Sequence, residues 1–412
     1  MNTLVKPFAA LHPETEHAST VMAPPYDVVN EEEARALVSE SPNSFLCVSR
    51  PETEFPLGTN PHSDAVHAKA KENLERLKTY GLLIRDDTPT YYVYKMKMGT
   101  HEQTGIALTA SIDAYNANLV KKHELTRPAK ENDRTRNMLS LNTQTGPVLS
   151  VCRTNQVLKK LLDSVKKNTP LFEAKGQYDV IHTIWRVEDG TTINAITAIF
   201  EDMQSIYIAD GHHRSAAAAR VSSKLRPSGT SSRASFDYFL TVVFPHDEMR
   251  IFDYNRVVTD LNGLSVTQVL SQLSKDFELE SIDKTVKPDA PGIFGMFLAD
   301  QWYRLTLRSH LLPTDDSVAL LDVSLLQDRI LSPVFGVGDP RTDSRLDFVG
   351  GVRGLEELER LVRSGKYAAA FSLYPTAMEQ LMAVADEGKL MPPKSTWFEP
   401  KLADGLLSHV LD

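Results

Sequence analysis

The residues best placed to do chemistry form one short segment of the chain, Asp210-Gly211-His212-His213-Arg214. An apolar run at 206–209 comes before this segment, and an alanine-rich stretch reaching residue 225 comes after it. This order predicts a buried strand, a glycine turn and a helix, with Asp210 as the N-cap. The first turn of a helix is positive, so an arginine and two histidines are unfavourable there unless an anion is bound. The segment therefore predicts a phosphate-binding turn, in which Gly211 lets the ligand approach the backbone closely.

Two other interpretations of this turn stay open. Arg214 could reach back to a nearby carboxylate, with the two histidines acting as hydrogen-bonded spacers. Alternatively, Asp210, His212 and His213 are all possible metal ligands, and Asp210 is the best candidate for Mg²⁺. Neighbouring residues of a helix point about 100° apart, so it would be awkward for both histidines to bind one ion.

A second cluster lies at residues 123–134, within a stretch, 121–139, whose net charge is +3 in a chain whose net charge is −9. Pro128 argues for a loop followed by a helix rather than one continuous helix. Such a loop could neutralise phosphate charge, with Glu124 as general base and His123 beside it. A solvated basic loop with local ion pairs is the alternative. The cations expected to contact phosphate are Arg127, Lys130 and Arg134, of which the last two share one helix face.

Two proline-rich segments could close a pocket around these clusters, or could equally be packed surface arms. The first, at 23–29, presents Tyr26 and Asp27, and the second, at 391–401, presents Lys394, Ser395 and Thr396. The sequence contains neither a Gly-x-x-x-x-Gly-Lys phosphate loop nor a Gly-x-Gly-x-x-Gly turn. We therefore expect ATP or ADP with Mg²⁺ to be bound in a different way, and we expect no flavin, NAD or haem.

The elements that must position these residues alternate between strand and helix, which predicts an α/β protein with a mixed sheet. A length of 412 residues predicts two domains. We place the phosphate-binding domain, with an extended N-terminal arm, at 1–260 and a smaller αβ domain, which contributes the pocket-closing loop, at 261–412. Residues 44–50 are apolar and predict a strand, and residues 226–235 predict a polar loop.

Composition narrows the classes of partner. The acidic balance makes nucleic acid an unlikely partner, because nucleic-acid binding usually needs a basic stripe. No apolar run approaches the ~20 residues that span a bilayer, and the first residues lack the apolar run of a signal peptide. Cys47 and Cys152 predict buried, reduced thiols. We expect a cytoplasmic protein whose partners are a nucleotide and a small molecule, while the oligomeric state is not indicated.

Four segments, 23–29, 123–134, 210–214 and 391–401, together resemble the DUF1015 family over nearly the whole chain. In addition, Gly211 to Arg214 followed by Ala217 and Ala218 is similar to the Gly-x-x-Arg-x-x-Ala turn of the ParB/sulfiredoxin superfamily. Members of that superfamily bind nucleotide phosphates at this turn, and they include free serine kinases, sulfiredoxins and CTP-using partition proteins. The resemblance implies a mixed-sheet ParB/sulfiredoxin-like core, phosphates held at 211–214, and a carboxylate such as Glu124 activating a hydroxyl.

These patterns lead to the hypothesis of a nucleotide-dependent phosphotransferase that acts on a small hydroxylated metabolite, with free serine as one candidate. Phosphoryl transfer needs charge neutralisation and alignment more than covalent chemistry, which suits a site rich in arginine. Two alternatives remain: a nucleotide-sensing, ParB-like regulator or adaptor without metabolic turnover, and a metal-dependent phosphohydrolase.

Overall fold

The structure, a computed structural model, describes residues 3–226 and 234–412. Seven of the ten residues of the loop predicted at 226–235 lie outside the described residues. Two units can be distinguished: Met1–Met249 together with Pro400–Asp412 form unit 1, and Arg250–Glu399 form unit 2. This division differs from the predicted one in two respects: the boundary lies at 249/250 rather than 260/261, and the last residues of the chain return to unit 1.

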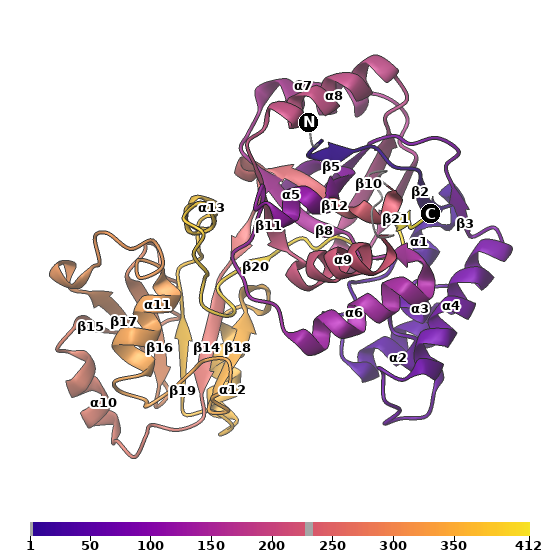
Figure 1. The fold of residues 1–412 in the computed structure, drawn as a ribbon. Helices are drawn as coiled ribbons and strands as arrows, with labels where there is room; N and C mark the ends of the chain where they lie inside the picture. The colour runs from indigo at the N-terminus through magenta and orange to yellow at the C-terminus, as the bar shows by residue number, and fades with distance from the viewer. Residues whose placement is uncertain (1–2, 227–233) are drawn as a thin grey trace. The chain divides into compact units, whose positions relative to one another are not determined.

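Unit 1 is built on a mixed sheet with the strand order β6-β11-β8-β12-β5-β4-β10-β9, and β1 pairs with β5 (Figure 1). The β8–β12 and β11–β6 pairs are parallel and the others antiparallel, which confirms the predicted α/β class with a mixed sheet. The strands are β1 (Val5–Lys6), β4 (Tyr92–Met98), β5 (His101–Ser111), β6 (Val120–Lys121), β8 (Val148–Cys152), β9 (Phe172–Lys175), β10 (Ile181–Arg186), β11 (Ile206–Asp210) and β12 (Tyr238–Pro245).

Helices pack on this sheet through apolar side chains that are fully or nearly fully buried. Leu158 and Leu162 of α7, Phe200 of α8 and Val221 of α9 join strand residues such as Ile208 in one core. Burial of this kind stabilises the fold by roughly 1.5–3 kcal/mol for each large side chain. The helices of unit 1 are α1 (Ala18–Val21), α2 (Glu31–Glu40), α3 (Leu46–Ser49), α4 (Asp64–Thr79), α5 (Ile112–Asn116), α6 (Pro128–Leu141), α7 (Gln156–Val165), α8 (Gly190–Asp202) and α9 (His212–Leu225).

The two ends of the chain meet in a small sheet of order β3-β2-β21-β7, which joins β2 (Ala10–Pro13), β3 (Leu83–Arg85), β7 (Thr143–Gln144) and β21 (Ser408–Val410). The N-terminal arm is therefore not a free extended segment. β1 and β2 pair with other strands, and Thr15–Val21 is helical. Residues 400–412 reach this position along a buried path, because Leu406 and Leu407 are both 0% exposed. The end of the chain is thus an integral part of unit 1.

The strand predicted at 44–50 is wrong. These residues form α3, followed by a 3₁₀ turn at Pro51–Glu54, and the four side chains of α3 are all buried. A short, wholly buried apolar run has no polar face that would reveal its period, so helix and strand look alike in the sequence. Cys47 consequently lies in a helix, but both cysteines are buried free thiols, as predicted.

Unit 2 contains an antiparallel sheet of order β15-β17-β16-β19-β14-β18, and a short β13–β20 pair. Among the described residues of both units, every helix is too short or too polar to serve as a membrane span. The elements of unit 2 are β13 (Ile251–Phe252), β14 (Tyr254–Val258), α10 (Val266–Leu273), β15 (Phe277–Ile282), β16 (Ile293–Leu298), β17 (Gln301–Leu307), α11 (Asp322–Leu326), β18 (Leu346–Gly350), α12 (Glu356–Arg363), β19 (Ala369–Ser372), α13 (Met378–Asp386) and β20 (Trp397–Phe398).

The returning segment generates a first prediction. Leu406→Ala should lower the free energy of unfolding of unit 1 by about 2–5 kcal/mol, because it opens a cavity under a fully buried side chain. Urea unfolding followed by circular dichroism measures the change. Leu57→Ala is the control, since Leu57 is 79% exposed. Equal, small losses in the two variants would show that residues 400–412 do not contribute to the core.

Candidate functional site

The predicted turn lies at the carboxyl end of β11, where Asp210 ends the strand and His212 begins α9. Gly211, rather than Asp210, is the N-cap, with a φ of +100° and no side-chain cap. The prediction of an Asp210 cap is therefore wrong, because the chain turns through a left-handed conformation that favours glycine. A Cβ on Gly211 would also lie 3.0 Å from Nε of Arg214.

The carboxylate of Asp210 faces two cations. Its Oδ2 lies 3.5 Å from Nζ of Lys401 and 3.9 Å from Nη2 of Arg214. Burial acts to raise the pKa of Asp210, but Lys401, Arg214 and His212 outweigh it and hold that pKa well below its usual range. An aspartate already paired with two cations is a poor Mg²⁺ ligand. Consistently, no group of three His, Cys, Asp or Glu side chains in the described parts of the chain is arranged to hold a metal ion.

Arg214 is buried at the centre of the site. Its Nη1 donates a 2.8 Å hydrogen bond to the carbonyl of Pro147. Burial lowers the pKa of Arg214, but Asp210 and Asp27 outweigh this effect and raise it above the usual value. The guanidinium therefore stays charged and is held in place by unit 1 itself, as one of the alternative interpretations requires.

The two histidines attach the 123–127 segment to the turn. The backbone N–H of His123 donates to Nε2 of His212 at 3.4 Å, and the backbone N–H of Arg127 donates to Nε2 of His213 at 3.0 Å. The rings of His123 and His212 also meet edge to face, with their centroids 4.4 Å apart. The two clusters that lie far apart in the sequence are thus neighbours in the structure.

Both turn histidines are neutral hydrogen-bond acceptors rather than additional positive charges. Burial lowers the pKa of His212 well below its usual range, and burial likewise lowers that of His213. With Nε2 of His212 accepting, the proton lies on Nδ1, which is 3.7 Å from the Glu124 carboxylate. His212 therefore helps to position Glu124, the predicted base, while burial lowers the pKa of His123 to about 4 and makes it a neutral packing partner.

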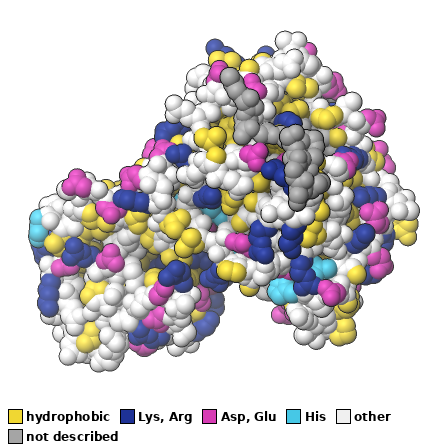
Figure 2. All heavy atoms as spheres, viewed as in Figure 1, with side chains coloured by type: hydrophobic (Ala, Val, Ile, Leu, Met, Phe, Trp, Pro, Cys, Tyr) yellow, Lys and Arg dark blue, Asp and Glu magenta, His cyan; other side chains and the backbone are white. Residues whose placement is uncertain are grey.

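A cavity of about 310 Å³ opens beside α6 in unit 1. Figure 2 shows Lys and Arg side chains gathered over the region of α6 and α9. Lys130 and Arg134 both line the cavity, as their predicted common face requires, and Tyr26 and Asp27 line it from the proline-rich segment. The other lining residues are Val29, Ser49, Arg50, Pro51, Glu52, Pro61, His62, Val66, His67, Asp133 and Asn137.

Arg134 contacts both Tyr26 and Asp133 in the wall of this cavity. Its guanidinium carbon lies 4.1 Å from the centre of the Tyr26 ring, and its Nη2 lies 2.6 Å from Oδ2 of Asp133. The carboxylate of Asp133 also accepts a 2.6 Å contact from Nδ1 of His62. Burial raises the pKa of Tyr26 to about 12, so its phenol keeps its proton and can act as a donor.

Asp404 completes the site, although no sequence motif marks it. Its backbone pairs with Ala23, which places it beside the Tyr26 segment. The carboxyl group is buried, and its Oδ1 has no hydrogen-bond partner among the described residues. Burial raises its pKa to about 7, against the opposing effect of Arg214. Gly146 makes room for this arrangement, since a Cβ there would lie 3.2 Å from Oδ1 of Asp404 and 3.3 Å from Cδ of Arg214.

The remaining predicted residues lie in unit 2. The Lys394 carbonyl accepts a 2.8 Å hydrogen bond from Arg256, and the Ser395 hydroxyl donates to the carbonyl of Pro392 at 2.6 Å. Thr396 is half-buried. Their role in closing the pocket remains a prediction.

The comparisons with known proteins place the chain in a family. The family model described as "Protein of unknown function (DUF1015)" matches residues 5–324, most of the chain. The chain belongs to this family. No curated protein matches the sequence.

Solved structures give a distant likeness. A conserved hypothetical protein from Pyrococcus furiosus is 13% identical with a TM-score of 0.36, and the match covers 73% of this chain and 94% of that one. SbnI from Staphylococcus aureus, truncated at its C-terminus, is 12% identical with a TM-score of 0.36, covering 72% and 85%. A free serine kinase in complex with AMP is 14% identical with a TM-score of 0.34, covering 71% and 86%. Scores this low say nothing about what the DUF1015 chain binds.

Asp404 generates a pH-dependent prediction. Because its pKa is raised in the folded state, that state binds the proton more tightly than the unfolded chain does between about pH 4 and pH 7. This contribution to stability is lost as the pH rises towards 7. Asp404→Asn cannot ionise. The melting temperature of the variant minus that of the wild type should therefore increase by several degrees between about pH 5 and pH 8. Asp163→Asn, at an exposed position of α7, is the control. Parallel curves for Asp404→Asn and wild type would contradict the assignment.

Proposed function

We propose that unit 1 binds ATP or ADP, with Mg²⁺, and transfers a phosphoryl group to a small hydroxylated metabolite. The observation that carries the proposal is the convergence of the buried Arg214 and the partly exposed Arg134 on Asp404, whose buried Oδ1 has no hydrogen-bond partner among the described residues. Both arginines act on the pKa of this one carboxyl group, so the three side chains share one electrostatic environment. Buried charges with spare hydrogen-bonding capacity are typical of sites that bind charged ligands.

The phosphate side of the site would be the turn and the basic face of α6. The N-cap glycine leaves the first N–H groups of α9 without a side-chain cap. The guanidinium group of Arg214 lies close to this glycine. Arg127, Lys130 and Arg134 would neutralise the transferring group from α6 and its N-cap. Backbone N–H groups and guanidinium groups together are well suited to phosphate oxygens. Asp210, paired with Lys401 and Arg214, would keep these cations in place, so Mg²⁺ would be held mainly by the nucleotide.

The acceptor side would be the cavity beside α6. Its volume of about 310 Å³ suits a small molecule and is at the lower end of the range for ligand pockets. Asp27 and Tyr26 offer an acceptor and a donor to a polar substrate. Free serine is the first acceptor to try, since the 211–214 turn resembles that of free serine kinases.

In the transfer itself, the acceptor hydroxyl oxygen would bond to the terminal phosphorus while the bond from that phosphorus to the nucleotide breaks. The hydroxyl proton would pass to a carboxylate. Glu124 is half-exposed and is positioned by His212, whereas Asp404 is buried with a pKa of about 7. A base works best when its pKa is close to the working pH, so we include Asp404 as a candidate beside Glu124.

The binding step is tested at Arg214. Thermal-shift titrations with ATP, ADP and CTP, each with and without Mg²⁺, should show stabilisation of the wild type, because a ligand that binds the folded state raises its melting temperature. Arg214→Ala should weaken nucleotide binding by at least about tenfold, through loss of charge-assisted hydrogen bonds. Arg220→Ala, on a more exposed face of the same helix, is the control. Unchanged affinity in a folded Arg214→Ala protein would exclude the turn as the phosphate site.

The catalytic step is tested separately. With serine and ATP, Glu124→Gln or Asp404→Asn should slow ADP release by about 10²–10⁴-fold while nucleotide binding is kept, as expected for loss of a general base. Coupled detection of ADP and mass spectrometry of the product measure the turnover. Full activity in both variants would refute the assignment of the base. Nucleotide binding without turnover of any hydroxylated acceptor would instead identify a nucleotide-sensing regulator.

A further inference from the structure

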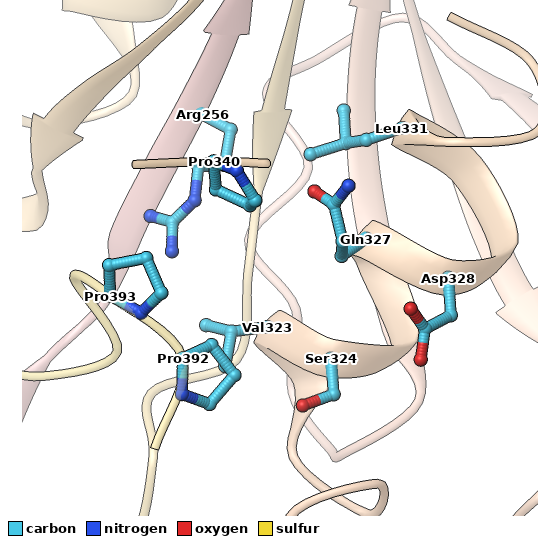
Figure 3. A pocket seen from close by; sticks show the side chains of 9 residues that line it. All are labelled: Arg256, Val323, Ser324, Gln327, Asp328, Leu331, Pro340, Pro392 and Pro393. Carbon is cyan, nitrogen blue, oxygen red and sulfur yellow. The ribbon is translucent and has the colours of Figure 1, made fainter. Parts of the chain in front are cut away.

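Unit 2 contains a cavity of about 270 Å³ that the proposed function does not use. Figure 3 shows how its walls are arranged: Arg256 enters from β14, Ser324 and Gln327 project from the helical segment opposite, and Pro392 and Pro393 lie at the edge. The other lining residues are Val323, Asp328, Leu331 and Pro340. The cavity is therefore mostly apolar, with a few polar groups directed into it, as in many small-molecule sites.

Arg256 is the unusual member of this set. Its side chain is buried, and in the described parts of the chain no carboxylate pairs with it. Nη2 donates to the carbonyl of Lys394 at 2.8 Å, Nη1 donates to the carbonyl of Tyr254, and the guanidinium lies 4.5 Å from the centre of the Phe348 ring. Nε–H donates to no described acceptor. Burial lowers the pKa of Arg256 to about 9, which shows how poorly its charge is compensated.

Two further polar atoms at the cavity lack partners. The hydroxyl of Ser324 and Oε1 of Gln327 are buried without a hydrogen bond to any described residue. Both N–H groups of the Gln327 amide are engaged, at 3.1 Å with the carbonyl of Val337 and at 3.0 Å with that of Gly338. The amide orientation is thereby fixed, so Oε1 can only accept. In Figure 3 this oxygen points towards the side on which Arg256 lies.

The backbone at Gln327 is also irregular. α11 continues as a π-helical turn over Gln327–Leu331, in which the N–H of Ser332 donates to the carbonyl of Gln327 at 2.9 Å. Single π-turns of this kind are rare and are frequent at functional sites. Here the turn carries three of the lining residues, namely Gln327, Asp328 and Leu331.

We propose that this cavity binds a small carboxylate that also carries an N–H or O–H donor, that is, an amino acid or a hydroxy acid. The carboxylate pairs with Arg256, the donor is accepted by Oε1 of Gln327, and Val323, Leu331 and the prolines contact the carbon skeleton. A single arginine without a second cation suits a carboxylate better than a phosphate dianion, which Asp328 at the lining would also disfavour. The site lies wholly in unit 2 and is independent of the function proposed for unit 1.

Isothermal titration calorimetry of the full chain with four probes tests the proposal. L-Lactate or L-alanine should bind saturably, and which of the two binds more tightly distinguishes a hydroxy acid from an amino acid. Propionate, which lacks the donor, should bind at least about tenfold more weakly, and inorganic phosphate should not compete. Arg256→Met should abolish binding, and Gln327→Met should reduce the better probe to the level of propionate.

Controls keep these outcomes separate from misfolding and from unit 1. Arg304→Met removes a cation paired with Asp289 in the same unit and should bind like the wild type. Arg220→Ala, in unit 1, should also leave this binding unchanged. If Arg256→Met does not fold, Arg256→Lys, which keeps the charge and loses the planar fork, should weaken binding at least about tenfold. Four results would overturn the proposal: no saturable binding of any carboxylate, full binding by folded Arg256→Met, loss of binding in Arg220→Ala, or tighter binding of phosphate.

Discussion

The site of unit 1 depends on the burial of Arg214, because a buried guanidinium must be compensated by nearby acceptors. The carbonyl of Pro147 accepts its hydrogen bond, Asp210 lies 3.9 Å away, and Asp27 adds a further favourable charge. Each of these groups comes from a different part of the chain. The left-handed Gly211 and the absence of a side chain at Gly146 allow the guanidinium to fit between them.

The same constraint gives the returning C-terminal segment its importance. It brings Lys401 to Asp210 and Asp404 to Arg214, so the Lys401–Asp210 ion pair and the buried Asp404 carboxyl group both depend on residues far along the chain. Two cations, Arg214 and Lys401, are thereby placed beside two carboxyl groups, of which Asp404 is buried and Asp210 is partly exposed. The histidines add no charge to this balance. They accept backbone N–H groups, which fixes the 123–127 segment and Glu124 at the turn.

The sequence predicts those parts of the site whose causes are local. Both the strand–turn–helix at 206–225 and the face shared by Lys130 and Arg134 arise from neighbouring residues. The helix at Leu46–Ser49 could not be predicted, because a fully buried run shows no periodicity. The N-cap was misassigned because the chain turns at Gly211 through a left-handed φ of +100°, which moves the start of the helix one residue beyond Asp210. Asp404 is near the site only through tertiary structure, and no local pattern in the sequence encodes that contact.

The central claim is that the 124–134 segment, the 211–214 turn and residues 400–405 surround one bound nucleotide. Hydrogen–deuterium exchange of the full chain, with and without a non-hydrolysable ATP analogue and Mg²⁺, tests this claim most directly. We expect the nucleotide to slow exchange in all three segments together and to leave the α7–α8 region of unit 1 unchanged. Protection confined to other segments, or protection of the turn without residues 400–405, would contradict it.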